Sequence, residues 1–264
     1  MTRHRFLIGR SLLETSAVTS RVLIEDKQRV KQIRKVLRLK TGHFVDLLDN
    51  EGNLFTARLA TIDTDSVEAF ITERHREPQR IRPSLTVFMP ILKKTDRFEW
   101  ALQKLTELGV DEIRPVYAER SIVRPGNTPE PRMDRWMSIT TEATEQSERY
   151  RTPRIYAPAP LEEILISSSQ SRLSRCSFIC AERSKSPHLV RLIYDASDNF
   201  APSPVSASNI SIFIGPEGGF SDTEIEIARE SGITLCSLGK TILRSETAAV
   251  VAAGLIVATT EYLW

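Results

Sequence analysis

Two apolar runs, each followed by a glycine loop and a helix-forming segment, constrain the fold of this chain more than any other feature. Residues 209–214 form the first run and lead directly into the glycine-rich stretch 215–220. Residues 233–238 form the second run, which ends at Gly239 and precedes a segment, 247–260, without any charged side chain. Strands that alternate with helices are typical of a mainly parallel sheet, and such sheets bind ligands just outside the carboxyl ends of their strands. We therefore expect the chemistry of the chain at these two glycine loops.

Basic residues concentrate at the start of the chain. Residues 1–40 contain eleven Lys or Arg and three Asp or Glu, an excess of eight positive charges. Because the whole chain carries +2, residues 41–264 carry six net negative charges. This asymmetry predicts a polyanionic partner for the N-terminal part. Val30, Ile33 and Leu37 recur at helical spacing with basic side chains opposite them, which indicates a helix with an apolar and a basic face. Such a face is often only solvated, but acids are nearly absent here, so we favour contact with phosphates.

Several classes of protein are not indicated. The chain contains no uninterrupted apolar run long enough to span a bilayer, so we expect no transmembrane helix and no membrane partner. Its first residues lack the long apolar stretch of a signal peptide. The three cysteines, Cys176, Cys180 and Cys236, fit no zinc or disulfide framework, and the four histidines lack metal-ligand spacing. We therefore expect no metal site and a reducing, cytoplasmic compartment.

The chain is predicted to form two domains. Residues 1–76 indicate a small β-rich domain, and the charged, proline-containing stretch 74–84 indicates a linker. Over residues 77–264, strands and helices alternate, which predicts an α/β domain. Asp96 with Glu99, and Ser221 with Glu224, have the spacing of capping boxes. The expected strands are 5–8, 43–48, 54–59, 67–71, 85–91, 110–116, 176–181, 210–214 and 233–238, and the expected helices are 26–40, 96–108, 133–149, 161–168, 187–196, 221–232 and 247–260.

The glycine loops match neither common nucleotide-binding motif. A phosphate-binding loop ending in Gly239-Lys240-Thr241 would need a glycine at position 234, where the chain has threonine. The order of glycines in 215–219 is not that of the dinucleotide fingerprint. Three glycines would still let the backbone approach a flat ligand closely, although a plain tight turn is the alternative.

Charged residues beside the uncharged segment are candidates for function. Arg244 and Glu246 stand next to a buried stretch, which usually means that they pair or act. Ser245 or Thr247 could instead simply cap the following helix. Glu145 and Arg149, four residues apart, could form a surface ion pair that contributes little to stability.

The two glycine segments also carry a resemblance. Ile-Gly-Pro-Glu-Gly-Gly-Phe-Ser-Asp-Thr-Glu-Ile at 214–225 and Leu-Gly-Lys-Thr-Ile-Leu-Arg-Ser-Glu-Thr-Ala at 238–248 resemble motifs of the RsmE family. These are uridine-N3 methyltransferases of small-subunit (16S) ribosomal RNA in the SPOUT superfamily. Residues 5–6, 36–42, 94–99, 103–109 and 145–149 resemble further motifs of that family. The chain departs from the family at Lys240 and Thr241, where proline and arginine are usual, and at Glu148, where glycine is usual.

The resemblance implies a fold and an activity. It implies an α/β C-terminal domain of the SPOUT type, with a trefoil knot and a mainly parallel sheet, after a PUA-like β-barrel that binds RNA. It further implies a homodimer that uses S-adenosyl-L-methionine to methylate N3 of a uridine in ribosomal RNA, free or in the small ribosomal subunit. A methyltransferase for another RNA base, or a catalytically silent RNA-binding protein of ribosome assembly, would be the alternatives.

The resemblance also implies site residues. The departure at Lys240 and Thr241 could alter cofactor affinity or the choice of target. Arg244 is expected to contact the uracil or a developing oxyanion, and Glu246 to orient Arg244 or accept the N3 proton. The expected cofactor-binding residues are Ala181, Glu182, Ile214, Gly215, Pro216, Glu217, Gly218, Gly219, Leu238, Gly239, Ile242, Leu243 and Thr247. The expected RNA-binding residues are Arg3, Arg5, Lys31, Arg34, Arg38 and Arg149.

Overall fold

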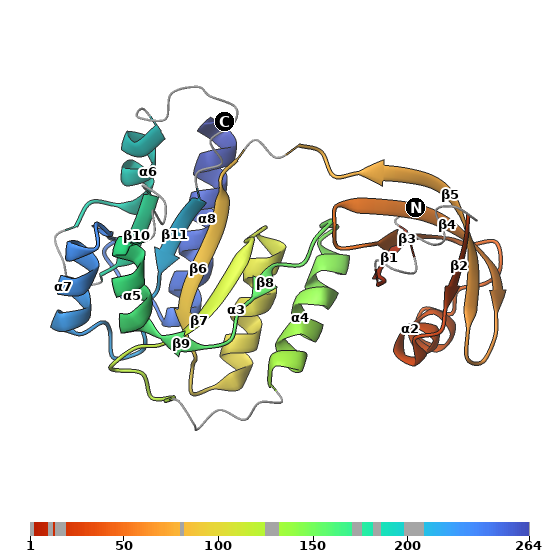
Figure 1. Ribbon diagram of the computed structural model, residues 1–264, viewed down its shortest axis with the longest axis horizontal. Helices are drawn as coiled ribbons and strands as arrows, with labels where there is room; N and C mark the ends of the chain where they lie inside the picture. Colours follow the sequence, from red (N-terminus) through yellow and green to blue (C-terminus); the bar gives the residue numbers. More distant parts are fainter. Residues whose placement is uncertain are drawn as a thin grey trace. The chain divides into compact units, whose positions relative to one another are not determined.

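The computed structural model describes residues 3–9, 13, 20–79, 82–124, 132–170, 176–181, 186–197 and 209–263 (Figure 1). Two compact units divide the chain. The first comprises residues 1–79 together with 141–152, and the second comprises residues 80–140 together with 153–264. The sequence prediction divided the chain after residue 76 and did not anticipate that 141–152 would join the first unit. No helix in the described part of the chain is long and apolar enough to cross a membrane.

A five-stranded sheet forms the first unit, with its strands in the order β1-β3-β4-β5-β2. The strands are β1 (His4–Leu7), β2 (Arg21–Ile24), β3 (Phe44–Leu48), β4 (Asn53–Ile62) and β5 (Val67–Arg76). β1 pairs with β3 in parallel and all other neighbours are antiparallel. β3 and β4 form a hairpin whose turn lies at residues 49–52. Asp49 Oδ1 accepts hydrogen bonds from the backbone N–H groups of Glu51 (2.7 Å) and Asn53 (3.0 Å), which closes the turn.

The basic helix of this unit is shorter than predicted. α2 (Lys27–Lys31) continues as one π-helical turn, η1 (Gln32–Val36), and does not reach residue 40. Val30 and Ile33 are buried in the same hydrophobic cluster as the inward-facing strand residues, as their spacing predicted. The helix closes when the Leu39 N–H bonds to the Ile33 carbonyl (3.0 Å), with Arg38 at φ 50° between them. A residue in this left-handed conformation ends a helix, which is why the helix does not reach residue 40.

Segment 141–152 is bound to the first unit by charged side chains. Glu145 accepts the Leu7 N–H (2.7 Å) and forms a two-pronged ion pair with Arg29 (Nη2–Oε1 2.6 Å, Nη1–Oε2 3.0 Å). The surface pair between Glu145 and Arg149 considered from the sequence is therefore wrong, because the Glu145 carboxylate is buried against Arg29. The helix itself, α4 (Arg132–Gln146), ends before residue 149.

A parallel sheet of seven strands forms the centre of the second unit. Its order is β12-β10-β11-β6-β7-β8, and β9 also pairs with β7. Every pairing is parallel, as predicted for the α/β domain. The strands are β6 (Ser84–Pro90), β7 (Glu112–Tyr117), β8 (Arg154–Ile155), β9 (Ala159–Pro160), β10 (Cys176–Cys180), β11 (Asn209–Phe213) and β12 (Thr234–Cys236).

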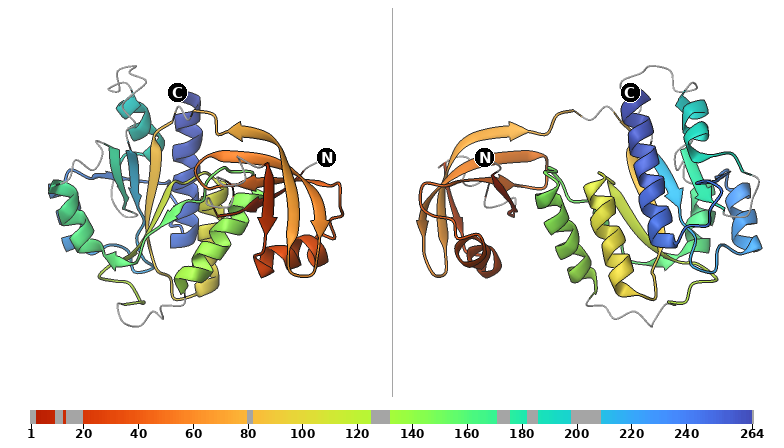
Figure 2. Two further views of the ribbon diagram at one scale, coloured as in Figure 1. Left: turned by 45° about the vertical axis from the view of Figure 1, so that its right-hand side comes forward. Right: turned by 180° about the vertical axis from the view of Figure 1, so that it is seen from behind.

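Helices cover both faces of this sheet (Figure 2). On one face, α3 (Thr95–Glu107), α4, α6 (Leu189–Ser197) and α8 (Ser245–Leu263) share a hydrophobic cluster with the sheet. On the other face, α5 (Leu161–Gln170) and α7 (Asp222–Glu230) pack over Phe88 and Phe213, whose rings stack at 4.2 Å. Because both faces are buried, the strands are continuous apolar runs rather than alternating ones.

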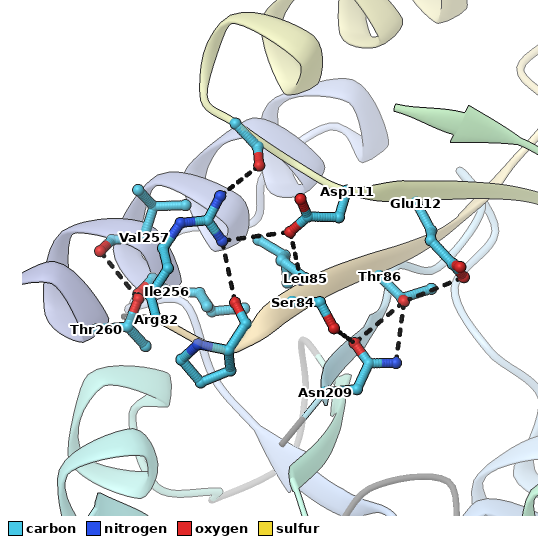
Figure 3. A network of polar contacts seen from close by, with 12 residues as sticks. Arg82, Ser84, Leu85, Thr86, Asp111, Glu112, Asn209, Ile256, Val257 and Thr260 are labelled. Carbon is cyan, nitrogen blue, oxygen red and sulfur yellow. Dashed lines mark hydrogen bonds and ion pairs between the residues drawn. The ribbon is translucent and has the colours of Figure 1, made fainter. Parts of the chain in front are cut away.

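Polar side chains fix the amino ends of the central strands (Figure 3). Asp111 Oδ2 accepts the Leu85 N–H (3.0 Å) and pairs with Arg82 (3.4 Å), which also donates to the Gly109 carbonyl (2.6 Å). Asn209 accepts from Ser84 Oγ (3.0 Å) beside them. With the amino ends tied together, the opposite edge of the sheet remains for the loops that bind ligands.

The sequence predicted some, but not all, of the residues that begin and end the helices. Ser221 and Glu224 form the predicted capping box at α7. Gly109, at φ 89°, ends α3 as predicted. The capping box predicted for Asp96 and Glu99 is wrong. Lys94 precedes α3 without a side-chain cap, and Glu99 pairs with Arg135 instead (3.2 Å).

Candidate active site

A pocket opens where three neighbouring strands end. β10 ends at Cys180, β11 at Phe213 and β12 at Cys236, and β10 lies between the other two. Since all three strands are parallel, the loops that follow them meet at one edge of the sheet. Six residues predicted to bind the cofactor line this pocket together: Ala181, Ile214, Gly215, Leu238, Gly239 and Leu243.

An adjoining pocket shares the wall around Ala181 and Gly215. The predicted residues Glu217, Gly218 and Gly219 line this second pocket, together with Arg120 and Phe220 among others. The two pockets account for nine of the thirteen predicted cofactor residues. Of the other four, Pro216 and Ile242 line neither pocket, Thr247 lines a third one, and Glu182 lies outside the described residues.

The glycines of the first loop are required by close approaches. A Cβ atom on Gly218 would lie 3.0 Å from the Cβ of Arg120 and 3.2 Å from its carbonyl oxygen. A Cβ atom on Gly215 would lie 3.3 Å from the Phe220 ring. Gly219 adopts φ 70°, and its N–H bonds to the Pro216 carbonyl (2.8 Å). These close approaches are to other parts of the protein and support the tight turn, and the close approach of a flat ligand to the bare backbone stays a prediction.

A buried carboxylate holds this loop against the loop after β7. Glu224 Oε1 accepts the N–H of Glu119 (2.8 Å), and its Oε2 accepts the N–H of Ser221 (2.8 Å). The side chain of Glu224 therefore fixes the position of Arg120, which follows Glu119 and lies against Gly218. This role of Glu224 adds to the capping role that its spacing predicted.

The second glycine loop is joined to the first by a serine. Ser245 Oγ donates to the Gly215 carbonyl (2.7 Å) and so connects the first turn of α8 to the glycine-rich loop. The capping role considered for Ser245 is replaced by this bond. Arg244, one residue earlier, is exposed and bonds to no side chain among the residues that the structure describes. Arg244 follows Leu243, which lines the first pocket, but Arg244 itself is not among the residues that line this pocket or the adjoining one.

Glu246 has a different partner from the one expected. Its buried carboxylate lies 3.5 Å from Arg97 Nη1 on α3. Arg97 and Glu246 line a third pocket with Asp96, Trp100 and Thr247. The expectation that Glu246 orients Arg244 thus finds no support in its contacts.

Sequence reasoning missed several residues of the first pocket. Cys180 and Cys236 face each other across β10 and β12, with their Sγ atoms 3.7 Å apart. Their pairing brings together residues 56 positions apart, so no local pattern could indicate it. Thr241, one of the two departures from the family pattern, also lines the pocket. The other missed residues are Ser237 and Ala248.

The predicted RNA-binding residues separate into two groups. Lys31, Arg34 and Arg38 are exposed and have no side-chain partner among the described residues. Arg3 and Arg5 are engaged within the first unit, as is shown by their contacts with Asp46 (3.5 Å) and Glu148 (3.2 Å) respectively. Arg149 is only partly exposed.

Two titratable groups are perturbed by burial. Burial raises the pKa of Glu145 despite its bonds to Leu7 and Arg29. Burial also raises the pKa of the Cys176 thiol to about 11, which keeps that thiol protonated.

Two family models match this chain and give its class, which is RNA methyltransferase. Residues 79–257 match the family described as RNA methyltransferase domain, and residues 25–72 match the RNA methyltransferase PUA domain. The first match covers more than half of the chain. It lies mainly in the second unit and identifies that unit as the methyltransferase part, whereas the second match lies within the first unit and identifies a PUA domain there.

Relatives narrow the class to one family. The ribosomal RNA small subunit methyltransferase E of Mesomycoplasma hyopneumoniae (strain 232) is 32% identical over 216 residues, covering 82% of this chain and 86% of that protein. The protein of the same name from Bacillus subtilis (strain 168) is 30% identical over 238 residues, covering 89% and 90%. The chain belongs to the ribosomal RNA small subunit methyltransferase E family, which confirms the resemblance.

A solved structure agrees with this assignment. The ribosomal RNA small subunit methyltransferase E from Neisseria gonorrhoeae bound to S-adenosyl methionine matches this chain with a TM-score of 0.78 and 28% identity. The match covers 100% of this chain and 98% of that one.

Proposed function

We propose that this chain transfers the methyl group of S-adenosyl-L-methionine to N3 of a uridine in small-subunit (16S) ribosomal RNA. The observation that carries the proposal is the pocket at the ends of β10, β11 and β12, which unites six of the predicted cofactor residues. The full-length similarity to a protein whose structure was solved with S-adenosyl methionine supports the choice of cofactor.

The residues of the pocket fit this cofactor. Gly215 and Gly218 present only backbone to the pockets that they line, which suits a flat adenine. Backbone groups around Leu238 and Gly239 face the same pocket and would hold the remainder of the molecule. When bound, the cofactor supplies an electrophilic methyl group, so the protein has only to orient the target and handle charge.

Two charged residues on either side of Ser245 would serve the uridine. Arg244 is exposed and free of side-chain partners in the described part of the chain, so its guanidinium would donate to a uracil carbonyl or to the oxyanion that develops there. Glu246 is held in place by Arg97, and its carboxylate would accept the N3 proton. Because N3 lies on the pairing edge of the base, the target uridine would have to be unpaired or flipped out.

The first unit would bind the RNA backbone. Lys31, Arg34 and Arg38 present free cations that suit phosphate oxygens. Arg149 is proposed to contact a phosphate or the target nucleotide. With ribosomal RNA as the substrate, the chain would act in the cytoplasm.

A homodimer belongs to the proposal. The uncharged part of α8 is only half covered, since Val250, Val251 and Leu255 are partly exposed. A second copy of the chain would cover this apolar face.

One experiment tests the activity and the role of Arg244. Nucleosides from ribosomal RNA are measured by mass spectrometry in cells with the chain, without it, and with Arg244→Ala or Arg244→Lys. We expect 3-methyluridine to be absent without the chain and reduced at least 100-fold with Arg244→Ala, because a removed oxyanion donor costs that much. Calorimetry should show unchanged binding of S-adenosylmethionine to Arg244→Ala. Full methylation by this variant would remove Arg244 from the mechanism, and unaltered 3-methyluridine without the chain would refute the activity.

A further inference from the structure

Four neighbouring strands of the first unit carry a row of alternating phenylalanine and arginine. Phe44 on β3 pairs with Arg58 on β4, Arg58 pairs with Phe70 on β5, and Phe70 pairs with Arg21 on β2. Residues that lie directly opposite each other on adjacent strands point to the same face of the sheet. We call this set (Phe44, Arg58, Phe70 and Arg21) the Phe–Arg row.

The Phe–Arg row points away from the hydrophobic core. All four side chains are exposed, and each phenylalanine has 46% of its surface accessible. The adjacent residues of the same strands, Val22, Val45, Ala57 and Ala69, are completely buried. The period of two along each strand therefore puts aliphatic residues inside and the row outside. Single exposed apolar residues are common on protein surfaces, but two half-exposed rings aligned on one face call for an explanation.

The charges in the row suit an anionic partner. Arg58 lies between the two phenylalanines and has no hydrogen-bond acceptor or ion-pair partner among the residues that the structure describes. Arg21 pairs with Glu68, next to the row, and no acidic side chain stands within it. The rings can stack on bases while the guanidinium of Arg58 reaches a phosphate. This combination is the one that binds single-stranded nucleic acid.

From this placement we infer that the Phe–Arg row is a stacking platform for unpaired bases of the RNA substrate. The inference rests on the proposed function, in which the first unit binds ribosomal RNA. The match of residues 25–72 to the RNA methyltransferase PUA domain includes Phe44, Arg58 and Phe70. A duplex would not use the row, because its bases are stacked on one another and hide their faces.

The geometry limits how the RNA would lie. Phe44 and Phe70 stand two strands apart, which is about 10 Å, with Arg58 between them. Two bases held by these rings would therefore be splayed apart, with backbone between them over Arg58. The row is separate from the basic helix, since Val30 and Ile33 pack into the core, from which the row points away.

The test measures RNA binding by the full-length chain. The probes are a fluorescent single-stranded oligouridine of twelve nucleotides and a duplex of the same length. The variants are Phe44→Ala with Phe70→Ala, Phe44→Tyr with Phe70→Tyr, and Arg58→Ala. Leu23→Ala, on the same face but without a ring, is the matched control. Thermal melting followed by circular dichroism verifies that each variant is folded.

Stacking and phosphate contact have different signatures. The double alanine variant should bind the single strand at least tenfold more weakly with an unchanged salt dependence, because each stacked base contributes at least about fivefold and two are lost. The double tyrosine variant should bind like the original chain. Arg58→Ala should reduce the slope of log affinity against log salt by about 0.7, the value for one phosphate on a single strand. Duplex binding and the Leu23→Ala control should not change.

The results that would overturn the inference are distinct from failure of the proposed function. Single-strand binding within twofold in the double alanine variant, while methylation persists, would refute the platform and leave the proposed function intact. A dimer that dissociates in this variant would instead assign the row to contact between copies and would also refute it. Absence of both RNA binding and methylation in the unaltered chain would refute the proposed function itself.

Discussion

At the residue scale, Glu145 couples the stability of the first unit to pH. Burial raises the pKa of its carboxyl group above the ordinary value of 4.5. Between the unfolded and folded pKa values the folded chain binds more protons than the unfolded chain. The contribution of Glu145 to stability is therefore fully present below the unfolded pKa and is lost as pH rises through the folded pKa.

The variant Glu145→Gln does not titrate, so it isolates this effect. We expect the free energy of unfolding of the original chain, relative to that of Glu145→Gln, to decrease as pH rises from about 4 to about 7. Urea unfolding at four pH values measures this difference. Glu226→Gln, whose carboxylate is exposed beside Arg229, is the control and should show no such trend. A difference that grows with pH would mean that the Arg29 pair outweighs burial.

Glu148 shows what sequence can and cannot predict about a single residue. The family usually has glycine there, and the backbone explains this, because Glu148 adopts φ 61°. That conformation disfavours residues with a Cβ atom. The side chain of Glu148 nevertheless bonds to Arg5, a long-range contact that no local pattern indicates. The departure from glycine was thus visible in the sequence, whereas its compensating partner was not.

At the scale of elements, the sequence predicted the parts of the site better than their connections. Apolar runs and glycines located β11, β12 and both glycine loops, because these signals are local. The order of the strands depends on non-local pairing, so the neighbours Cys180 and Cys236 were not predicted as pocket residues. The short strands β2, β8 and β9 were not predicted either, since none of them lies within an apolar run that the sequence analysis recognised as a strand.

The bond from Ser245 to Gly215 joins the two glycine loops, and its loss should weaken cofactor binding. We expect Ser245→Ala to lower the affinity for S-adenosylmethionine by about fivefold to tenfold, because a net hydrogen bond is worth about 1 kcal/mol. Calorimetry measures the affinity. Ser231→Ala removes a similar bond, to the Leu165 carbonyl (2.9 Å) at the end of α7, and should lower stability without changing affinity. Equal affinity in both variants would show that the first loop holds its shape without α8.

At the scale of the whole molecule, the first unit is discontinuous in sequence. Segment 141–152 belongs to it and supplies Glu145 to Arg29 and to the Leu7 N–H. The same segment supplies Thr152 N–H to Asn50 Oδ1 (2.7 Å) and Arg151 to Glu77 (2.8 Å). Local patterns placed residues 141–149 in a helix, but they carried no information about the unit to which its end would bind.

This discontinuity predicts that residues 1–79 are not a self-sufficient domain. Without the segment, residues 1–79 lose the Arg29–Glu145 pair and the acceptor of the Leu7 N–H, and hydrogen bonds to charged groups contribute about 1.5–3 kcal/mol each. A domain of this size has a total stability of about 4–12 kcal/mol, so the loss is a large fraction of it. We expect residues 1–79 alone to melt at least 10 °C below the same residues joined to 141–152 through a flexible glycine-serine linker. Circular dichroism measures the melting temperature of both chains. In the joined chain, Glu145→Ala should lower the melting temperature. Gln146→Ala, at an exposed position, is the control and should leave the melting temperature unchanged. Equal melting of the short and the joined chains would show that the segment only rests on a unit that is already complete.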